Sequence, residues 1–165
     1  MDTYYDDIAE GYDELHKVEQ LKKLAIIKKE LTIEKNMKLL DVGCGTGVSS
    51  DFNCHVTGID PSKKLIEIAK RNFPEKTFIE ASAEHIPFEN ESFDIVISLT
   101  AIQNFANMTK GLAEIKRVGK REFALTFLKK STKSKQIEKE ICKLFSDKHI
   151  KKIAEDKDII LIIKE

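Results

Sequence analysis

A glycine-rich turn is the feature that most restricts what this chain can fold into. Residues 41–47 read D-V-G-C-G-T-G and directly follow a short apolar run over residues 38–42. Three glycines let the backbone pass close to a ligand where any Cβ atom would collide. A turn of this kind after a first strand is typical of nucleotide-binding α/β sheets.

The rest of the chain alternates short apolar runs with helical patterns. We predict an α/β, Rossmann-like, doubly wound fold whose seven-stranded sheet is mostly parallel, with a final antiparallel strand. The whole chain, residues 1–165, forms one domain, in which residues 1–34 are an N-terminal segment and helix. The expected strands are 38–42, 55–59, 77–81, 95–99, 123–128, 149–153 and 159–163, and the last two are close enough in sequence to pair. The expected helices are 14–31, 48–52, one capped by Ser62, 107–118 and 131–145; the apolar face of the first carries Leu15, Val18, Leu21, Leu24, Ala25, Ile27 and Leu31.

Composition excludes several classes of protein. Apolar residues make up 41% and charged residues 34% of the chain, as in a soluble globular domain. No apolar run approaches the roughly 18–20 residues of a membrane span, and the acidic start is unlike a signal peptide, so we expect a cytoplasmic protein with no membrane contact. The cysteines, Cys44, Cys54 and Cys142, form no C-x-x-C pair, so we predict neither disulfides nor a metal site.

Charge is distributed unevenly along the chain. The first 14 residues carry six acidic groups, whereas residues 107–152 carry 14 Lys or Arg against five Asp or Glu. Such asymmetry can steer a polyanion toward one face of a protein. The alternative is a solvated, lysine-rich surface.

Two carboxylates indicate which class of ligand the glycine turn binds. Asp60 ends the second strand 17 residues after Gly43, where it can accept hydrogen bonds from both hydroxyls of a ribose. A dinucleotide-binding turn would have glycine where Val48 stands, and no phosphate-binding Gly-Lys-Ser/Thr occurs. Asp41 would repel a pyrophosphate but suits an ammonium group, so we predict an amino-acid nucleoside cation as the ligand.

These segments resemble the class I S-adenosylmethionine (SAM)-dependent methyltransferases. The D-V-G-C-G-T-G turn and the G-I-D-P-S of residues 58–62 resemble their first two motifs. Residues 5–13 are similar to their Y-D-x-x-A-x-x-Y-D segment, residues 83–88 to their A-E-x-L-P-F segment, and residues 92–94 to their S-F-D. The resemblance implies SAM as cofactor, S-adenosyl-L-homocysteine as product, and a methyltransferase domain of the type 11 kind.

The resemblance also implies which residues bind the cofactor. Tyr5 and Tyr12 either close over SAM or anchor the first helix, and Cys44 is a small filler rather than a nucleophile. This chain has Ser82 where the family usually has an Asp that contacts the adenine, and the helix after Gly47 is shortened. The implied cofactor-binding residues are Tyr12, Asp41, Gly43, Cys44, Gly45, Gly47, Asp60, Pro61, Ser82, Ala83, Glu84 and Leu99.

The acceptor substrate is indicated by the segment that follows the fourth strand. Its S-x-x-A-I-Q pattern resembles the guanine nitrogen-7 methyltransferases of small-subunit ribosomal RNA, which a small zinc-binding protein activates. Guanine nitrogen-7 has a free lone pair and needs no general base, so no catalytic residue is assigned; Gln103 and Asn104 are candidates to contact a purine edge, and Phe105 to stack on a base. His85 could act as a base toward a hydroxyl or an acidic carbon, or simply lie on a surface loop.

Two other functions remain open. One is a small-molecule methyltransferase of the quinone-biosynthesis type, which would require a lid that so short a chain has little room for. The other is a non-catalytic SAM-binding partner subunit, against which the complete glycine turn and Asp60 argue.

Overall fold

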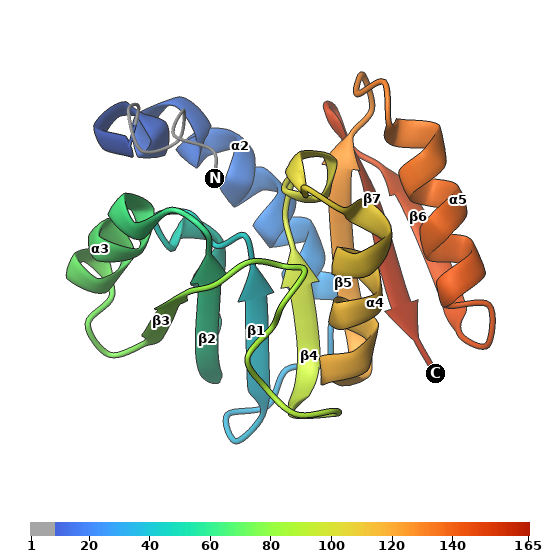
Figure 1. The fold of residues 1–165 in the computed structure, drawn as a ribbon, viewed down its shortest axis with the longest axis horizontal. Helices are drawn as coiled ribbons and strands as arrows, with labels where there is room; N and C mark the ends of the chain where they lie inside the picture. The colour runs from blue at the N-terminus through green and yellow to red at the C-terminus, as the bar shows by residue number, and fades with distance from the viewer. Residues whose placement is uncertain (1–8) are drawn as a thin grey trace.

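A single seven-stranded sheet organises the protein (Figure 1). The computed structural model describes residues 9–165, with side chains from residue 17 onward. The strand order is β3-β2-β1-β4-β5-β7-β6, and β7 is antiparallel to both of its neighbours. The strands are β1 (Lys38–Val42), β2 (His55–Asp60), β3 (Thr77–Glu80), β4 (Phe93–Ser98), β5 (Gly119–Leu128), β6 (His149–Ala154) and β7 (Asp158–Lys164). The predicted doubly wound sheet with a final antiparallel strand is therefore confirmed.

Helices cover both faces of this sheet. The 3-10 helix η1 (Val48–Ser50), α2 (Ala9–Glu30) and α3 (Lys63–Asn72) lie on one face. The other face carries α4 (Met108–Val118) and α5 (Ser134–Leu144), whose Leu112, Ile115, Ile137 and Ile141 are buried against it. A second 3-10 helix, η2 (Ile102–Asn104), lies between β4 and α4. None of the described helices is long and apolar enough to cross a membrane.

Side-chain caps begin two of these helices, and the cap by Ser62 was predicted from the sequence. The Ser62 hydroxyl accepts a hydrogen bond from the Leu65 amide at 3.2 Å, which satisfies an otherwise unpaired amide at the start of α3. The Asn107 side chain accepts in the same way from the Lys110 amide at the start of α4. By contrast, α5 begins at Ser134 rather than at residue 131, because residues 131–134 form a turn closed by the Ser134 amide and the Ser131 carbonyl.

The prediction for the inner face of the first helix is wrong in part. Leu24, Ile27 and Leu31 are buried, but Val18 is 65% and Leu21 43% exposed. Figure 1 shows the reason: the N-terminal turns of α2 extend past the carboxyl edge of the sheet, and only its C-terminal half packs on the strands.

Candidate functional site

The glycine turn leaves the carboxyl end of β1 with a conformation that only glycine adopts easily. Gly43, Gly45 and Gly47 have φ angles of 77°, 56° and 91°. A Cβ atom on Gly43 would lie 2.6 Å from the Cβ of Ala101, and one on Gly47 would lie 2.8 Å from the Phe73 ring. The turn is therefore held tightly against the segment that follows β4.

Asp60 faces this turn from the end of β2. Its Oδ2 accepts a hydrogen bond from the Gly45 amide at 3.0 Å, and its Oδ1 accepts from the Ser62 amide at 2.9 Å. These two bonds fix the carboxylate beside the turn. A carboxylate has about four acceptor positions, so the group that orients the turn can also receive ribose hydroxyls.

Asp41 lies beneath the turn and is completely buried. The hydroxyls of Ser49 and Ser50 donate to its Oδ2 at 2.6 and 2.7 Å. Its Oδ1 is buried and accepts no hydrogen bond from any residue that the structure describes. Burial is the main reason that the pKa of Asp41 rises to about 6; the two serine hydroxyls oppose the rise, and the charge of Asp60 adds to it. A nearby cation would satisfy this carboxylate.

Three further predicted cofactor residues surround the turn. Cys44 is buried against Gly58, and burial raises the pKa of its thiol well above the usual value. Burial therefore favours the neutral form of this thiol. Leu99 is buried in the core beneath α2, and Pro61 is exposed at the rim. Tyr5 and the side chain of Tyr12 lie outside the described part of the chain, and their roles remain predictions.

The loop after β3 lies alongside the turn and carries Ser82, Ala83 and Glu84. Ala83 is buried, whereas Ser82 is partly exposed. The Glu84 carboxylate accepts a hydrogen bond from the Asn107 amide at 2.9 Å, so its role in this structure is to hold the start of α4. His85 is exposed, with its Nε2 3.2 Å from Lys110 Nζ, which agrees with a surface-loop histidine.

Sequence reasoning missed the residues that fix this loop. Glu114 accepts from the Ile86 amide at 3.0 Å, and the Arg117 guanidinium donates to the carbonyls of Ile86 and Phe88 at 3.0 and 2.8 Å. Glu114 and Arg117 also pair with each other at 2.7 Å. Their spacing, three residues apart on a predicted helix, was the available signal.

The candidate acceptor residues lie on η2. Gln103 Nε2 donates to the Thr100 carbonyl at 2.7 Å, while its Oε1 is buried and has no hydrogen-bond partner. Asn104 is exposed. Phe105 is partly buried and packs closely on Gly111 of α4, so its ring belongs partly to the core.

A buried ionic cluster, which sequence reasoning did not find, lies next to the start of η2. Lys23 of α2, 2% exposed, lies 3.4 Å from Asp158 Oδ1 and donates to the Thr100 hydroxyl at 2.5 Å. The hydroxyls of Thr100 and Thr126 both donate to Asp158 Oδ2, at 2.7 and 2.9 Å. Thr100 has a φ of 54°, which is strained for a β-branched residue. The cluster holds this strained residue at the carboxyl end of β4.

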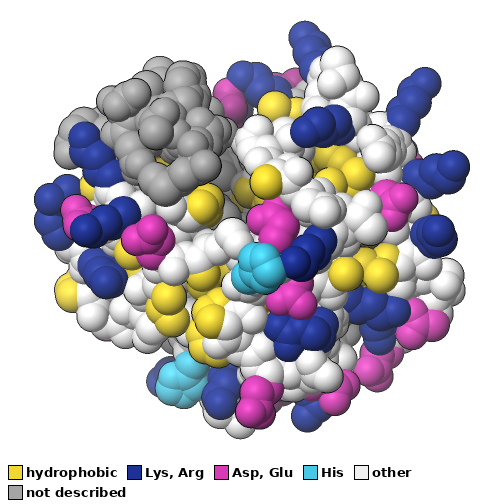
Figure 2. Space-filling view, in the orientation of Figure 1, with side chains coloured by type: hydrophobic (Ala, Val, Ile, Leu, Met, Phe, Trp, Pro, Cys, Tyr) yellow, Lys and Arg dark blue, Asp and Glu magenta, His cyan; other side chains and the backbone are white. Residues whose placement is uncertain are grey.

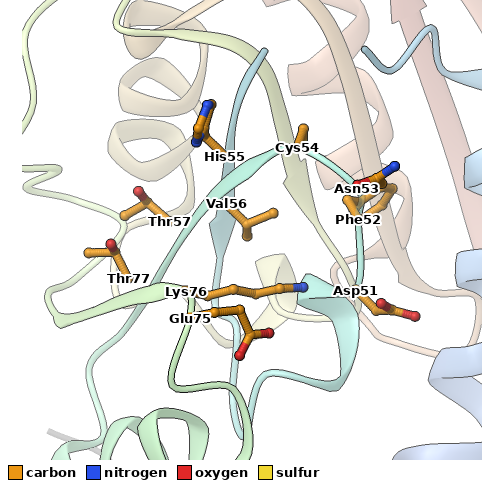
Figure 3. A pocket seen from close by; sticks show the side chains of 10 residues that line it. All are labelled: Asp51, Phe52, Asn53, Cys54, His55, Val56, Thr57, Glu75, Lys76 and Thr77. Carbon is orange, nitrogen blue, oxygen red and sulfur yellow. The ribbon is translucent and has the colours of Figure 1, made fainter. Parts of the chain in front are cut away.

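The segment after the glycine turn is short, and a hollow lies beyond it at the amino ends of the strands. The predicted helix over residues 48–52 is only the three-residue η1. Beyond it, a cavity of about 460 Å³ opens at the amino ends of β2 and β3 (Figure 3). Figure 3 shows Lys76 extending across this cavity, and its ammonium donates to the Ser50 carbonyl beside η1. The cavity lies at the amino ends of the strands, so it is separate from the candidate site.

Comparisons with known proteins agree with this arrangement. Residues 40–127 match the family model described as a methyltransferase domain. An uncharacterized protein of Methanocaldococcus jannaschii is 38% identical over 119 residues, which are 70% of this chain and 45% of that protein. A Campylobacter jejuni ubiquinone/menaquinone biosynthesis C-methyltransferase is 33% identical over 116 residues, 64% of this chain and 49% of that one. The chain thus spans about half the length of these relatives.

One solved structure is similar over nearly the full chain. It is the complex of the Haloferax volcanii Trm112 methyltransferase activator with a methyltransferase, and it has a TM-score of 0.82 at 14% identity, covering 97% of this chain and 96% of that one. At this identity the match concerns the fold.

The fold and the turn together define a Rossmann-like methyltransferase of class I. The match over more than half of the chain gives the more particular assignment: the protein belongs to the methyltransferase domain family. SAM is the cofactor that this family implies, and the residues fit it. The glycine turn admits a ligand close to the backbone, and the buried Asp41 has an unpartnered oxygen that an ammonium group would satisfy.

Proposed function

We propose that the protein is a SAM-dependent methyltransferase that methylates a lone-pair nitrogen of RNA, with guanine nitrogen-7 of ribosomal or transfer RNA as the target. The observation that carries this proposal is the chemistry of the acceptor end. Amide and aromatic side chains lie there, in Gln103, Asn104 and Phe105. The titratable side chains around them contact other groups: His85 contacts Lys110, and Glu84 holds the Asn107 amide. This arrangement suits a nucleophile that needs no deprotonation.

Each half of the proposed site has a defined task. SAM supplies an electrophilic methyl group when it is bound. Asp60 would hold the ribose, Asp41 would face the ammonium group, and Ser82, Ala83 and Glu84 would lie along the adenine. Gln103 would position the acceptor: its amide nitrogen is committed to the Thr100 carbonyl, so its Oε1 is left to accept from an N–H such as those on the edge of guanine. Alignment and exclusion of water would then provide the catalysis.

We also propose a small zinc-binding activator as a partner. The Haloferax volcanii methyltransferase, which is similar to this chain over nearly its full length, is found in a complex with the Trm112 activator. This likeness supports the partner that the sequence resemblance implies.

Methylation of a quinone precursor is the second candidate. It is favoured by the relatives, which include ubiquinone/menaquinone biosynthesis and demethylmenaquinone methyltransferases at 30–34% identity. An acidic carbon acceptor would require a base, and His85 is the candidate that the sequence offers for that role.

Radiolabelled SAM distinguishes the two candidates. The protein, alone and with a Trm112-type activator, is incubated with total RNA, total protein and a lipid extract. We expect label in RNA, released as 7-methylguanine after hydrolysis. Label confined to lipid would overturn the RNA proposal in favour of the quinone type, and SAM binding with no transfer under any condition would favour a non-catalytic subunit. Gln103→Leu is expected to reduce transfer into RNA about tenfold or more while SAM affinity is unchanged, because it removes the proposed acceptor oxygen together with the amide donor that is bonded to the Thr100 carbonyl.

A further inference from the structure

Lysines form a line on the exposed face of α5. Lys135, Lys139 and Lys143 are spaced four residues apart and are all exposed, while Ile137 and Ile141 on the opposite side of the helix are buried. Figure 2 shows Lys and Arg side chains projecting from the right-hand edge of the molecule, where Figure 1 places α5. The lysines therefore share one face rather than surrounding the helix.

Repulsion between these three lysines destabilises α5, and no ion pair with a described carboxylate offsets it. Like charges four residues apart lie on the same side of a helix and destabilise it. Among the described residues, Lys135, Lys139 and Lys143 have no carboxylate partner, and the nearby Glu138 is paired with Lys152 at 2.8 Å. The face is thus arranged to present positive charge outward.

The same charge continues to the acceptor end of the candidate site. The connection between β5 and α5 carries the exposed Lys129 and Lys133, and Lys133 Nζ donates to the Gln103 carbonyl at 3.3 Å. Beside α5, a hollow of about 450 Å³ has four lysines and one carboxylate in its lining; they are Lys129, Lys135, Lys139, Lys152 and Glu138, of which the last two pair with each other. A path of positive charge therefore runs from η2 along the length of α5, about 16 Å at the rise of an α-helix.

We infer that this lysine track, made of Lys129, Lys133, Lys135, Lys139 and Lys143, is the docking surface for the phosphate backbone of the RNA substrate. The inference rests on the proposed function, because it takes the acceptor to be a nucleic acid. Lysines on flexible stems neutralise phosphates without selecting a sequence, whereas the amide and aromatic groups of η2 contact the base. An acidic protein or an anionic membrane has no base for these amide and aromatic groups to contact, so neither explains why the track leads to η2.

A pair of charge-matched variants tests the track. Lys135→Glu/Lys139→Glu reverses two charges on it. Lys35→Glu/Lys120→Glu reverses two exposed lysines at the opposite, amino edge of the sheet, at the turn before β1 and at the start of β5. Binding of a short fluorescein-labelled single-stranded RNA of mixed sequence is measured by anisotropy, with S-adenosylhomocysteine present, from about 50 to about 200 mM salt.

The track variant should bind this RNA about tenfold or more weakly than the parent protein, and its log–log salt slope should be shallower by about 1.4, since each lost phosphate contact contributes about 0.7. The amino-edge variant should lose much less. An equal loss of RNA affinity in the two variants would mean that only the net charge of the protein matters. No loss in the track variant would mean that the track does not bind RNA. Either result overturns the inference. The inference would also be overturned if the protein bound phosphatidylglycerol vesicles through the track and did not bind RNA. Unchanged S-adenosylhomocysteine affinity and circular dichroism establish that the variants are folded.

Failure of the track and failure of the proposed function give different results. Transfer of label into RNA by both variants at the parental rate would contradict the track and leave the function intact. Track-dependent RNA binding by a protein that labels only lipid would contradict the function and leave the surface intact.

Discussion

Asp41 and Asp158 are two fully buried carboxylates in opposite halves of the sheet, and their surroundings differ. In the half formed by β1, β2 and β3, Asp41 accepts hydrogen bonds from two serine hydroxyls, and none of the described residues forms an ion pair with it or donates a hydrogen bond to its Oδ1. In the half formed by β4 to β7, Asp158 has the ammonium of Lys23 and two threonine hydroxyls. Both carboxylates have an Oδ1 that accepts no hydrogen bond from the described residues, but only Asp158 is paired with a cation, Lys23. The cofactor half thus keeps a carboxylate that a cationic ligand can pair with, whereas the other half uses its paired carboxylate to hold a strained backbone.

The largest effect should come from breaking the satisfied pair. Lys23→Met leaves Asp158 buried without its cation, so the free energy of unfolding should fall by about 3–5 kcal/mol in chemical denaturation. SAM affinity of the folded protein should change little. Adding Asp158→Asn to this variant should restore most of the loss, because no buried charge then remains.

The exposed pair of Lys28 and Asp51, 3.3 Å apart, offers a matched control. Lys28→Met should cost no more than about 1 kcal/mol, since solvent screens exposed ion pairs. Equal losses of unfolding free energy in Lys23→Met and Lys28→Met would show that the buried cluster contributes no more to stability than an exposed ion pair.

Gly43→Ala should affect the cofactor half in a different way. The new Cβ would lie 2.6 Å from Ala101 Cβ, at a φ that alanine rarely adopts. We expect a loss of about 2–4 kcal/mol in unfolding free energy and at least about a hundredfold loss of SAM affinity by calorimetry, because the turn itself must move. Gly43→Ala/Ala101→Gly removes the collision and leaves the backbone strain, so it should recover part of both losses; no recovery would mean that the contact with Ala101 is not what fixes the turn.

The raised pKa of Asp41 predicts an inverse dependence of stability on pH. Because the folded-state pKa of about 6 lies above the usual value of 3.8, the folded state binds the proton more tightly than the unfolded one. This contribution, about 3 kcal/mol, is present below pH about 4 and is lost as pH rises through about 6. Denaturation across this interval should show the fall in the parent protein and a smaller one in Asp41→Asn.

Binding across the same interval tests what the carboxylate is for. If Asp41 faces the ammonium group of SAM, affinity should increase as pH rises through about 6, when the carboxylate becomes charged, and should stay level in Asp41→Asn. A level affinity in the parent protein would contradict that placement.

These contrasts also explain what the sequence could predict. The cofactor half is encoded locally: the glycines, Asp60 and Ser62 lie within one strand–turn–strand–helix stretch, and each has a short-range reason for its position. The cluster of Lys23, Thr100 and Asp158 joins residues as much as 135 positions apart, as Lys23 and Asp158 are. Lys23 stands in a helical pattern as one more surface lysine, and only the packing of α2 on the sheet buries it. For the same reason the exposure of Val18 and Leu21 could not be read from periodicity, which does not say where the sheet ends.

Asp60→Ala should cause a smaller loss of SAM affinity than Gly43→Ala, and it tests the proposed ribose contact directly. The change removes the acceptor of the Gly45 and Ser62 amides together with the proposed ribose contact. A lost hydrogen bond to a charged group corresponds to about 1.5–3 kcal/mol, so SAM affinity should fall by about one to two orders of magnitude. Ser62→Ala is the matched control, because it removes the cap of α3 at a cost of about 1 kcal/mol in stability while Asp60 stays in place. If Asp60 holds the ribose, only the first variant weakens binding; if both weaken it equally, the carboxylate serves the loop between β2 and α3 and the ribose lies elsewhere.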